Sequence, residues 1–251
     1  MDDVELLKKR FIELANKSYN SGIFLFTDFL GLMEQSAFNE IKRTLGPLPY
    51  SVYGGADGAE RVMIRFGDEE SFGYSVPFPI VCIKAEPVSQ KFADKLTHRD
   101  FLGALLNLGI ERSTLGDIPI LDNVGYIFVK EDIAGFIISE LTRVKRTDVK
   151  LSIVDALPEG ELYKTERRRV QANGERLDAV ISKVFSLSRE EGQSLFSKKL
   201  VFVDGRLCEN TSYIPKRNER ISVRGYGRMV YLGYESTSKK GKLNIEVDLY
   251  V

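Results

Sequence analysis

Hydrophobic spacing is most regular in the last third of the chain. Leu177, Val180, Ile181 and Val184 recur at the spacing of one helix face, which predicts an amphipathic helix. Ser188 follows, and a glutamate three residues later completes a capping box, which marks the start of a second helix. The pattern therefore predicts two consecutive short helices.

A small hairpin is predicted directly after these helices. Asp204 and Gly205 separate two runs, 201–203 and 206–208, that have the pattern of strands. Asp-Gly is typical of a type I′ turn because such a turn needs positive φ at both central positions. Two short helices and a small basic hairpin are too small to enclose a catalytic pocket, but they can present a charged face. We therefore interpret this stretch as a binding module.

The first 76 residues alternate between helical and extended patterns. Apolar spacing predicts a helix over 3–19, and Thr27 or Asp28 is expected to cap a second helix that runs to about residue 45. Two strands are expected, at 50–53 and 61–66. The glycine-rich loop between them, 54–59, lacks the lysine of a phosphate-binding P-loop. A turn with special backbone angles is favoured there over a nucleotide site.

Residues 79–156 carry strand and helix patterns in the order β-α-β-β-α-β. The predicted elements are a strand at 80–86, a helix at 99–108, strands at 116–120 and 125–129, a helix at 133–144 and a strand at 149–154. This order is that of a ferredoxin-like domain. Tyr126 and Phe128 alternate on one face of a central strand. They form either a base-stacking platform or part of the core, and a core position is favoured.

The segments that flank the basic module are less regular. A linker is expected around 157–160, and residues 166–169 form either a basic extension of the binding face or a solvated linker. Near the C-terminus, apolar residues at 243, 245, 247 and 249 alternate with polar ones. That alternation predicts a final strand.

Basic and acidic residues are unevenly distributed, although the net charge is zero. Residues 164–230 carry 15 Lys and Arg against 8 Asp and Glu, a balance of +7, whereas residues 1–163 carry 18 against 25, a balance of −7. Solvation of an ordinary surface explains many charge runs. Here the basic segment has 10 arginines against 5 lysines, and arginine is the better bidentate partner for phosphate. The asymmetry favours a protein that contacts nucleic acid with one end.

Length and composition disfavour several classes of protein. No run of about 18 apolar residues occurs and the N-terminus is acidic, so neither a membrane span nor a secretory signal is expected. Cys82 and Cys208 are far apart and the chain has one histidine, which argues against a disulfide framework or a structural zinc site. We expect a cytoplasmic α+β protein of two or three small domains, without metal or cofactor.

Four short motifs in the basic module resemble the RNA-binding domain first described in ribosomal protein S-four, also called the αL motif. They are Arg176-Leu177-Asp178, Leu187-Ser188-Arg189, Val203-Asp204-Gly205 and Arg220-Ile221-Ser222-Val223. Three positions depart from the usual pattern. Gly192 stands where alanine is common, Lys199 where a glycine usually ends the second helix, and Asn218-Glu219 where Gly-Asp usually precedes the last strand. These departures are expected to alter turns rather than the basic face.

Further motifs extend the resemblance over nearly the entire chain. They are Tyr53-Gly54-Gly55, Gly58-Ala59-Glu60-Arg61, His98 to Leu105, Leu108 to Arg112, Gly116-Asp117-Ile118 and Ser222 to Arg228. With them, the chain resembles the bacterial YlmH family. The resemblance implies a small N-terminal α/β domain (1–76), a ferredoxin-like domain expected to bind RNA (77–160) and a C-terminal S-four-type domain (161–251).

The same resemblance implies a role in ribosome-associated quality control. The implied partners are ribosomal RNA, tRNA and the large ribosomal subunit carrying a stranded peptidyl-tRNA, which the C-terminal domain would contact. No membrane contact is expected, and the protein is expected to be a monomer.

The resemblance also implies specific RNA-binding residues. In related modules the arginines that open the first and second helices contact ribosomal RNA, and these correspond to Arg176 and Arg189. A cation in the first turn of a helix opposes the macrodipole, so the position of Arg189 is electrostatically unfavourable by itself. A phosphate bound jointly by Arg189 and the free backbone N–H groups would explain why an arginine stands there. The further expected RNA contacts are Ser188, Lys198, Lys199, Arg206, Arg224 and Arg228.

Catalysis has little support in the sequence. His98 lies beside Thr97 and Asp100 at a predicted helix start, where a cap or a buried structural role is favoured over a general base. The protein is therefore predicted not to be an enzyme. One alternative is an RNA-modifying enzyme with an active site in the first 160 residues, and another is a protein-interaction scaffold with an exposed apolar patch on the acidic half.

Overall fold

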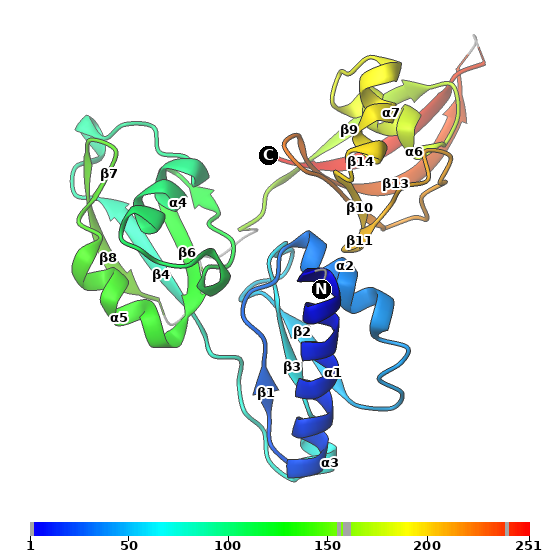
Figure 1. The fold of residues 1–251 in the computed structure, drawn as a ribbon. Coiled ribbons are helices and arrows are strands. Elements are labelled where there is room, and N and C mark those ends of the chain that lie inside the picture. The colour runs from blue at the N-terminus through cyan, green and yellow to red at the C-terminus, as the bar shows by residue number, and fades with distance from the viewer. Residues whose placement is uncertain (1–2, 155–156, 158–161, 239–240) are drawn as a thin grey trace. The chain divides into compact units, whose positions relative to one another are not determined.

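The chain is a mixed α and β protein, as expected from its sequence. The computed structural model describes residues 3–154, 157, 162–238 and 241–251 (Figure 1). It divides into two compact units, one of Met1–Glu34 with Ile41–Leu162, the other of Gln35–Glu40 with Tyr163–Val251. The two expected N-terminal domains thus fall within a single unit. The expected boundary at 160/161 lies outside the described residues, as does the linker at 157–160 apart from Leu157.

The N-terminal part of the first unit holds a small antiparallel sheet, in the order β1-β3-β2. Its strands are β1 (Leu25–Phe26), β2 (Tyr50–Tyr53) and β3 (Met63–Phe66), and the helices of this region are α1 (Asp3–Ser21), α2 (Leu32–Ile41) and α3 (Glu69–Phe72). Most of α2, Gln35–Glu40, is counted with the second unit. The second helix begins later than expected because Thr27 is not a cap. Its hydroxyl accepts the Ile64 N–H at 2.9 Å, and its own N–H donates to the Ile64 carbonyl at 2.9 Å. Tertiary pairing thus holds this segment extended.

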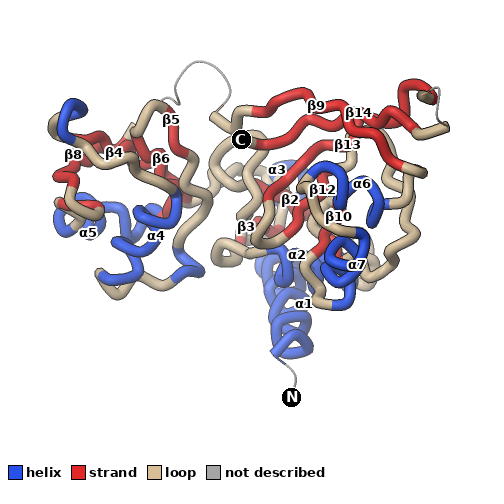
Figure 2. The backbone as a smooth tube through the Cα atoms, turned by 90° about the horizontal axis from the view of Figure 1, so that it is seen from above, coloured by secondary structure: helices blue, strands red, loops and turns tan. Residues whose placement is uncertain are grey.

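The rest of the first unit is a five-stranded antiparallel sheet with two main helices. The elements are β4 (Ile80–Pro87), α4 (His98–Asn107), β5 (Ile120–Leu121), β6 (Val124–Lys130), α5 (Glu131–Glu140), β7 (Arg143–Val144) and β8 (Thr147–Ile153). The strand order is β5-β6-β4-β8-β7, and Figure 2 shows α4 and α5 on the same side of this sheet. The predicted β-α-β-β-α-β order is present, with one additional short strand, β7, between α5 and β8.

Two elements of this region differ clearly from their predicted bounds. The strand expected at 116–120 is observed only at Ile120–Leu121. The expected helix 133–144 ends at Glu140, and Arg143 and Val144 form β7 instead. They pair with Asp148 and Thr147 across a tight turn, in which Lys145 has φ +55°. Helical periodicity continued past the point where the chain reverses, so spacing alone placed the end of this helix too late.

Tyr126 and Phe128 lie in the core, as favoured from the sequence. They are 8% and 1% exposed and form a buried cluster with Phe29, Met63 and Cys82. This cluster lies on the opposite face of β6 from Ile127 and Val129, which face α4 and α5. The small N-terminal sheet thus covers the sheet face that carries the two aromatic rings.

The glycine-rich loop makes this packing possible. Gly55 has φ +96°, and a Cβ at this position would lie 2.3 Å from Cδ1 of Phe128. The loop is therefore a turn with special backbone angles, as predicted, and it leaves room for the ring of Phe128. Neighbouring Arg61 adds a polar link, because its Nε donates to Leu115 O at 2.8 Å and its Nη2 to Phe29 O at 2.9 Å and Arg112 O at 3.0 Å.

The second unit is built on a six-stranded antiparallel sheet in the order β11-β10-β12-β13-β14-β9. Its strands are β9 (Thr165–Ala172), β10 (Val201–Val203), β11 (Arg206–Leu207), β12 (Arg220–Val223), β13 (Gly227–Thr237) and β14 (Leu243–Tyr250). The helices α6 (Leu177–Val184) and α7 (Arg189–Ser197) pack their apolar residues against one face of this sheet (Figure 1). No helix in the described part of the chain is long and apolar enough to cross a membrane.

Candidate nucleic-acid interface

The two helices of the second unit begin as the sequence indicated. Leu177, Val180 and Ile181 are fully buried against the sheet, so α6 turns its other side outward. At the start of α7, Ser188 Oγ accepts the Glu191 N–H at 3.2 Å, and the Glu191 carboxylate accepts the Ser188 N–H at 2.8 Å. The expected capping box is present, and it fixes the direction in which α7 leaves the loop.

A cleft of about 270 Å³ opens where the starts of these helices meet the end of β9. Its lining residues are Ala172, Asn173, Gly174, Arg176, Asp178, Ala179, Ser182, Lys183, Leu187 and Arg189. The structure therefore brings Arg176 and Arg189 to one cleft, although 13 positions separate them. Lys183 joins them there and was not expected from the sequence. It lies seven residues after Arg176, about two helical turns, and this spacing would have indicated the same helix face.

Arg176 is held by a neighbouring carboxylate. Its Nε donates to Oδ1 of Asp178 at 3.1 Å and its Nη2 to Oδ2 at 2.9 Å. Gln193 Nε2 donates to Oδ2 at 3.2 Å and the Ala179 N–H to Oδ1 at 2.9 Å. Burial alone would raise the pKa of Asp178, but the hydrogen bonds from Arg176 and Gln193 outweigh it and lower the pKa. Arg176 therefore faces the cleft with part of its donor capacity already used.

Arg189, unlike Arg176, is not held by a carboxylate within the described part of the chain. It is the first residue of α7 and its side chain is exposed, and among the described residues no side chain pairs with its guanidinium. Ser188, also an expected contact, uses its hydroxyl oxygen as the helix cap. A phosphate placed at this point would meet the Arg189 guanidinium and the positive end of the helix.

The other expected contacts are distributed around the unit. Lys198 and Lys199 follow α7, and Arg224 lies next to them because its N–H donates to the Leu200 carbonyl at 2.9 Å. All three are exposed, but none of them lines the cleft. Arg206 lies in β11, one residue before Leu207, whose N–H donates to Oγ of Ser36 at 3.0 Å within the same compact unit.

Arg228 lies outside the cleft. Its guanidinium carbon is 4.4 Å from the ring centre of Tyr250 and 5.3 Å from that of Tyr163. Both contacts are in the range of cation–π interactions. Its strand partner is Ser222. The structure thus places Arg228 among aromatic side chains at the sheet rather than with Arg176 and Arg189.

The arginine run at 167–169 belongs to a strand rather than to a linker. It lies in β9, where Arg167 Nε donates to Asp248 Oδ1 at 2.7 Å and Arg169 Nη2 to Glu246 Oε1 at 3.2 Å. Arg169 also pairs with Glu235. These acidic partners lie beyond residue 230, so the charge count for residues 164–230 overstated the free positive charge. The run is neither a solvated linker nor an unpaired basic extension.

The three departures from the S-four-type pattern have clear structural roles. Lys199 and Asn218 have φ +56° and +70°, the left-handed region where glycine is most easily accommodated. Gly192 lies at the contact between the helices, where a Cβ would be 1.9 Å from Ser182 Oγ. The Ser182 hydroxyl, which donates to Asp178 O at 2.8 Å, thus occupies the space that a side chain at 192 would need.

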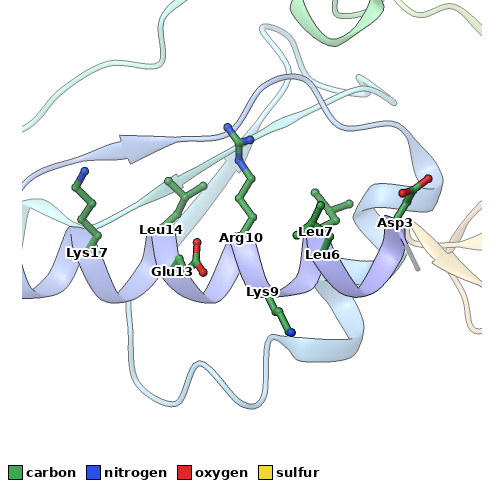
Figure 3. A pocket seen from close by; sticks show the side chains of 8 residues that line it. All are labelled: Asp3, Leu6, Leu7, Lys9, Arg10, Glu13, Leu14 and Lys17. Atoms are coloured by element: carbon green, nitrogen blue, oxygen red, sulfur yellow. The ribbon is translucent and has the colours of Figure 1, made fainter. Parts of the chain in front are cut away.

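A second hollow, of about 680 Å³, runs along α1 and has a different character (Figure 3). It is lined by Asp3, Leu6, Leu7, Lys9, Arg10, Glu13, Leu14 and Lys17. Figure 3 shows Arg10 and Lys17 on one side of the helix and Lys9 on the other. Because acidic and basic side chains alternate with leucines, this hollow does not gather one sign of charge.

Comparisons with known proteins agree with the expectation of an RNA-binding domain in the central part of the chain. Residues 78–157 match a family model described as "Putative RNA-binding domain in YlmH". The chain is 29% identical over 226 residues to the ribosome-associated protein quality control protein P2 of Bacillus subtilis (strain 168), covering 87% of this chain and 84% of that protein. A solved structure, the cell division protein ylmH from Streptococcus pneumoniae, shows 23% identity and a TM-score of 0.48, covering 61% of this chain and 92% of that one. The chain therefore contains a region that matches the YlmH RNA-binding-domain model, and most of its length is similar to the Bacillus subtilis protein.

Proposed function

We propose that this protein binds structured RNA on the ribosome and catalyses no reaction. In this proposal its C-terminal unit contacts ribosomal RNA and tRNA on large subunits that carry a stranded peptidyl-tRNA, in the cytoplasm. The observation that carries the proposal is the convergence of Arg176, Lys183 and Arg189 on one cleft at the starts of α6 and α7. The name of the Bacillus subtilis relative, a ribosome-associated quality control protein, supports the ribosome as the site of action.

The chemistry of this cleft suits a phosphate. Arginine offers a planar fork of donors, and charge-assisted hydrogen bonds to phosphate are stronger than neutral ones. The first N–H groups of a helix have no partner within the helix, and the capping box at Ser188 satisfies only part of them. Glu191, which could repel an anion, is turned back onto the Ser188 N–H. A backbone phosphate can therefore approach Arg189 without meeting an unpaired carboxylate from this residue.

The local architecture supports the proposal that the C-terminal unit is an S-four-type domain. Its helices α6 and α7 lead into the β10–β11 hairpin and then β12, the order that the sequence motifs imply. Asp204 and Gly205 have φ +46° and +72°, as a type I′ turn requires. In this arrangement the two arginines of the motif lie at the starts of consecutive helices, facing one cleft.

Shifted titratable groups in the first unit favour a structural role over the alternative of an RNA-modifying enzyme. Burial, together with the neighbouring Arg61, lowers the pKa of Arg112 to about 10. Both arginines donate to main-chain carbonyls, Arg112 to Leu115 O at 2.8 Å and Gly116 O at 3.1 Å. Burial raises the pKa of the Cys82 thiol to about 12, which keeps it protonated and unreactive. These contacts hold segments of the fold together.

The proposal is tested by sedimentation and crosslinking. Full-length protein should sediment with large ribosomal subunits that carry peptidyl-tRNA, and ultraviolet crosslinks should map to ribosomal RNA and tRNA. The affinity should fall steeply as salt increases, because phosphate contacts release counterions. The proposal would be contradicted if the protein did not sediment with large subunits. An affinity that stayed unchanged from about 50 to 200 mM salt would also contradict it.

A further inference from the structure

The central domain must contact any RNA by a surface other than its aromatic sheet face. RNA-recognition domains of similar topology stack bases on exposed aromatic residues of the central strands. Here Phe128 is 1% exposed and packs with Phe29 and Met63. A base cannot reach this ring without separating the two sheets of the first unit.

An exposed aromatic ring occurs instead on the loop after β4. Phe92 ends the short 3₁₀ turn Gln90–Phe92 and is 81% exposed, and nearby Val88 is 70% exposed. Such exposure leaves Phe92 with almost no part in stabilising the fold. Its ring is therefore free to contact a ligand.

This loop is ordered by buried and main-chain hydrogen bonds. The Asp94 N–H donates to Oγ1 of Thr147 at 2.9 Å, and Thr147 is 5% exposed. The Leu96 N–H donates to Oδ1 of Asn123 at 2.7 Å, and Asn123 Nδ2 donates back to the Asp94 carbonyl at 3.0 Å. Phe92 is thus presented from a fixed loop, which reduces the entropy lost when a ligand binds.

One cation lies over this ring, and others are exposed on the same loop and on the turn held against it. Lys91 Nζ lies 5.5 Å from the centre of the ring. The β7–β8 turn is held against the loop by the Arg146 N–H, which donates to Asp94 at 3.3 Å, and by Lys145 Nζ, which donates to Lys95 O at 3.4 Å. The side chains of Lys95, Arg99 and Arg146 are exposed and form no ion pair among the described residues. Residues 88–100 and 143–150 together carry 7 Lys and Arg against 3 Asp and Glu, within a half of the chain that is acidic overall.

We propose that loop 88–96 and the β7–β8 turn form a contact site for single-stranded RNA. Phe92 stacks on an unpaired base, and Lys91, Lys95 and Arg146 contact the flanking phosphates. An aromatic ring among cations is the arrangement by which single strands are bound without sequence preference. A protein partner would be expected to need a larger apolar surface than Phe92 and Val88 provide. This inference rests on the proposed function in one respect, that the ligand of the protein is RNA.

The test uses the full-length protein and a fluorescein-labelled single-stranded RNA of 12 nucleotides and mixed sequence. The affinity for this RNA is measured for three variants, Phe92→Ala, Phe92→Leu and Phe92→Tyr, in the wild-type and the Arg189→Ala backgrounds. The second background separates binding at Phe92 from binding through the C-terminal cleft. Ala and Leu should weaken binding roughly five- to hundredfold, because stacking on a base is lost. Tyr should bind as Phe does. The matched control is Phe136→Ala on α5, a ring that is 50% exposed near Glu131, Asp132 and Glu140, and it should leave the affinity unchanged.

The outcomes separate this inference from the proposed function. If the RNA binds the Phe92 variants as tightly as the wild type, or does not bind at all, the inference is overturned. If Phe92→Leu keeps full affinity, the contact is apolar rather than stacked, which also overturns it. The proposed function fails independently, when Arg189→Ala leaves sedimentation with large subunits unchanged.

Discussion

Arg176 and Asp178 are joined by two parallel hydrogen bonds, from Nε to Oδ1 at 3.1 Å and from Nη2 to Oδ2 at 2.9 Å. The Asp178 side chain is 5% exposed and that of Arg176 is 44% exposed. The arginine expected to contact RNA thus also neutralises a buried carboxylate. Its removal should affect both binding and the fold, unlike removal of the unpaired Arg189.

Arg176→Ala should lower the free energy of unfolding by roughly 1–3 kcal/mol. Loss of one partner leaves a buried charge less well compensated. The figure is reduced because Arg176 is partly solvated and because Gln193 and the Ala179 N–H still bond Asp178. Urea unfolding followed by circular dichroism measures the change. In an Asp178→Asn background the same substitution should cost less, and an equal cost in both backgrounds would show that the pair does not stabilise the fold.

The stability contributed by Asp178 should depend on pH. Its pKa is lowered in the folded protein, so its contribution is present above about pH 4, the ordinary range of an aspartate. The contribution is lost as the pH falls through the lower folded value. The difference in unfolding free energy between wild type and Asp178→Asn should therefore be largest near neutral pH and shrink in acid. A difference that grew below about pH 4 would contradict the assignment.

The local elements of the C-terminal unit could be predicted from its sequence, whereas its sheet could not. The capping box at Ser188 and the Asp-Gly turn at 204–205 depend on a few adjacent residues, and both are present. The strand β9 pairs with β14, whose residues lie more than 70 positions away. Local pattern carries no information on such a partner, so the arginines of β9 were interpreted as either a basic extension or a linker rather than as a strand.

Only part of the candidate site could be predicted from the sequence, because local motifs do not show which side chains meet in the folded protein. Sequence motifs indicated Arg176 and Arg189, and the structure brings both to one cleft. Arg228 was also expected as a secondary RNA contact, yet its interaction with Tyr250 holds it elsewhere. Asp178 was not foreseen as a partner of Arg176, because residue type alone does not show which charges pair.

Phe128→Ala should destabilise the first unit by about 3–5 kcal/mol, as large-to-small changes in a core do. Phe128 is 1% exposed and fills the space above Gly55. Thermal unfolding followed by circular dichroism checks this value, with Phe92→Ala as a control because that ring is 81% exposed. A Phe128→Ala protein with an unchanged melting temperature but weakened RNA binding would mean that the ring acts as a stacking surface.

Gly192→Ala should destabilise the protein by about 1–3 kcal/mol, the usual cost of an overpacked site. Alanine normally favours a helix over glycine, but here its Cβ would lie 1.9 Å from Ser182 Oγ. Ser182→Ala removes that oxygen, so the cost of Gly192→Ala should be smaller in this background. A double-mutant cycle in urea measures the coupling. Additive effects would show that Ser182 and Gly192 do not compete for the same space.

The most direct test of RNA binding through the C-terminal cleft compares Arg189→Ala with Arg167→Ala. Both variants remove one arginine from the second unit, but Arg167 is paired with Asp248 on β14, whereas Arg189 opens α7 at the cleft. The measurement is the affinity for large ribosomal subunits by co-sedimentation, with circular dichroism to verify folding. Arg189→Ala should bind roughly tenfold to a hundredfold more weakly, the loss of one charge-assisted contact, while Arg167→Ala should bind as the wild type does. A folded Arg189→Ala protein that sediments like the wild type would contradict the account.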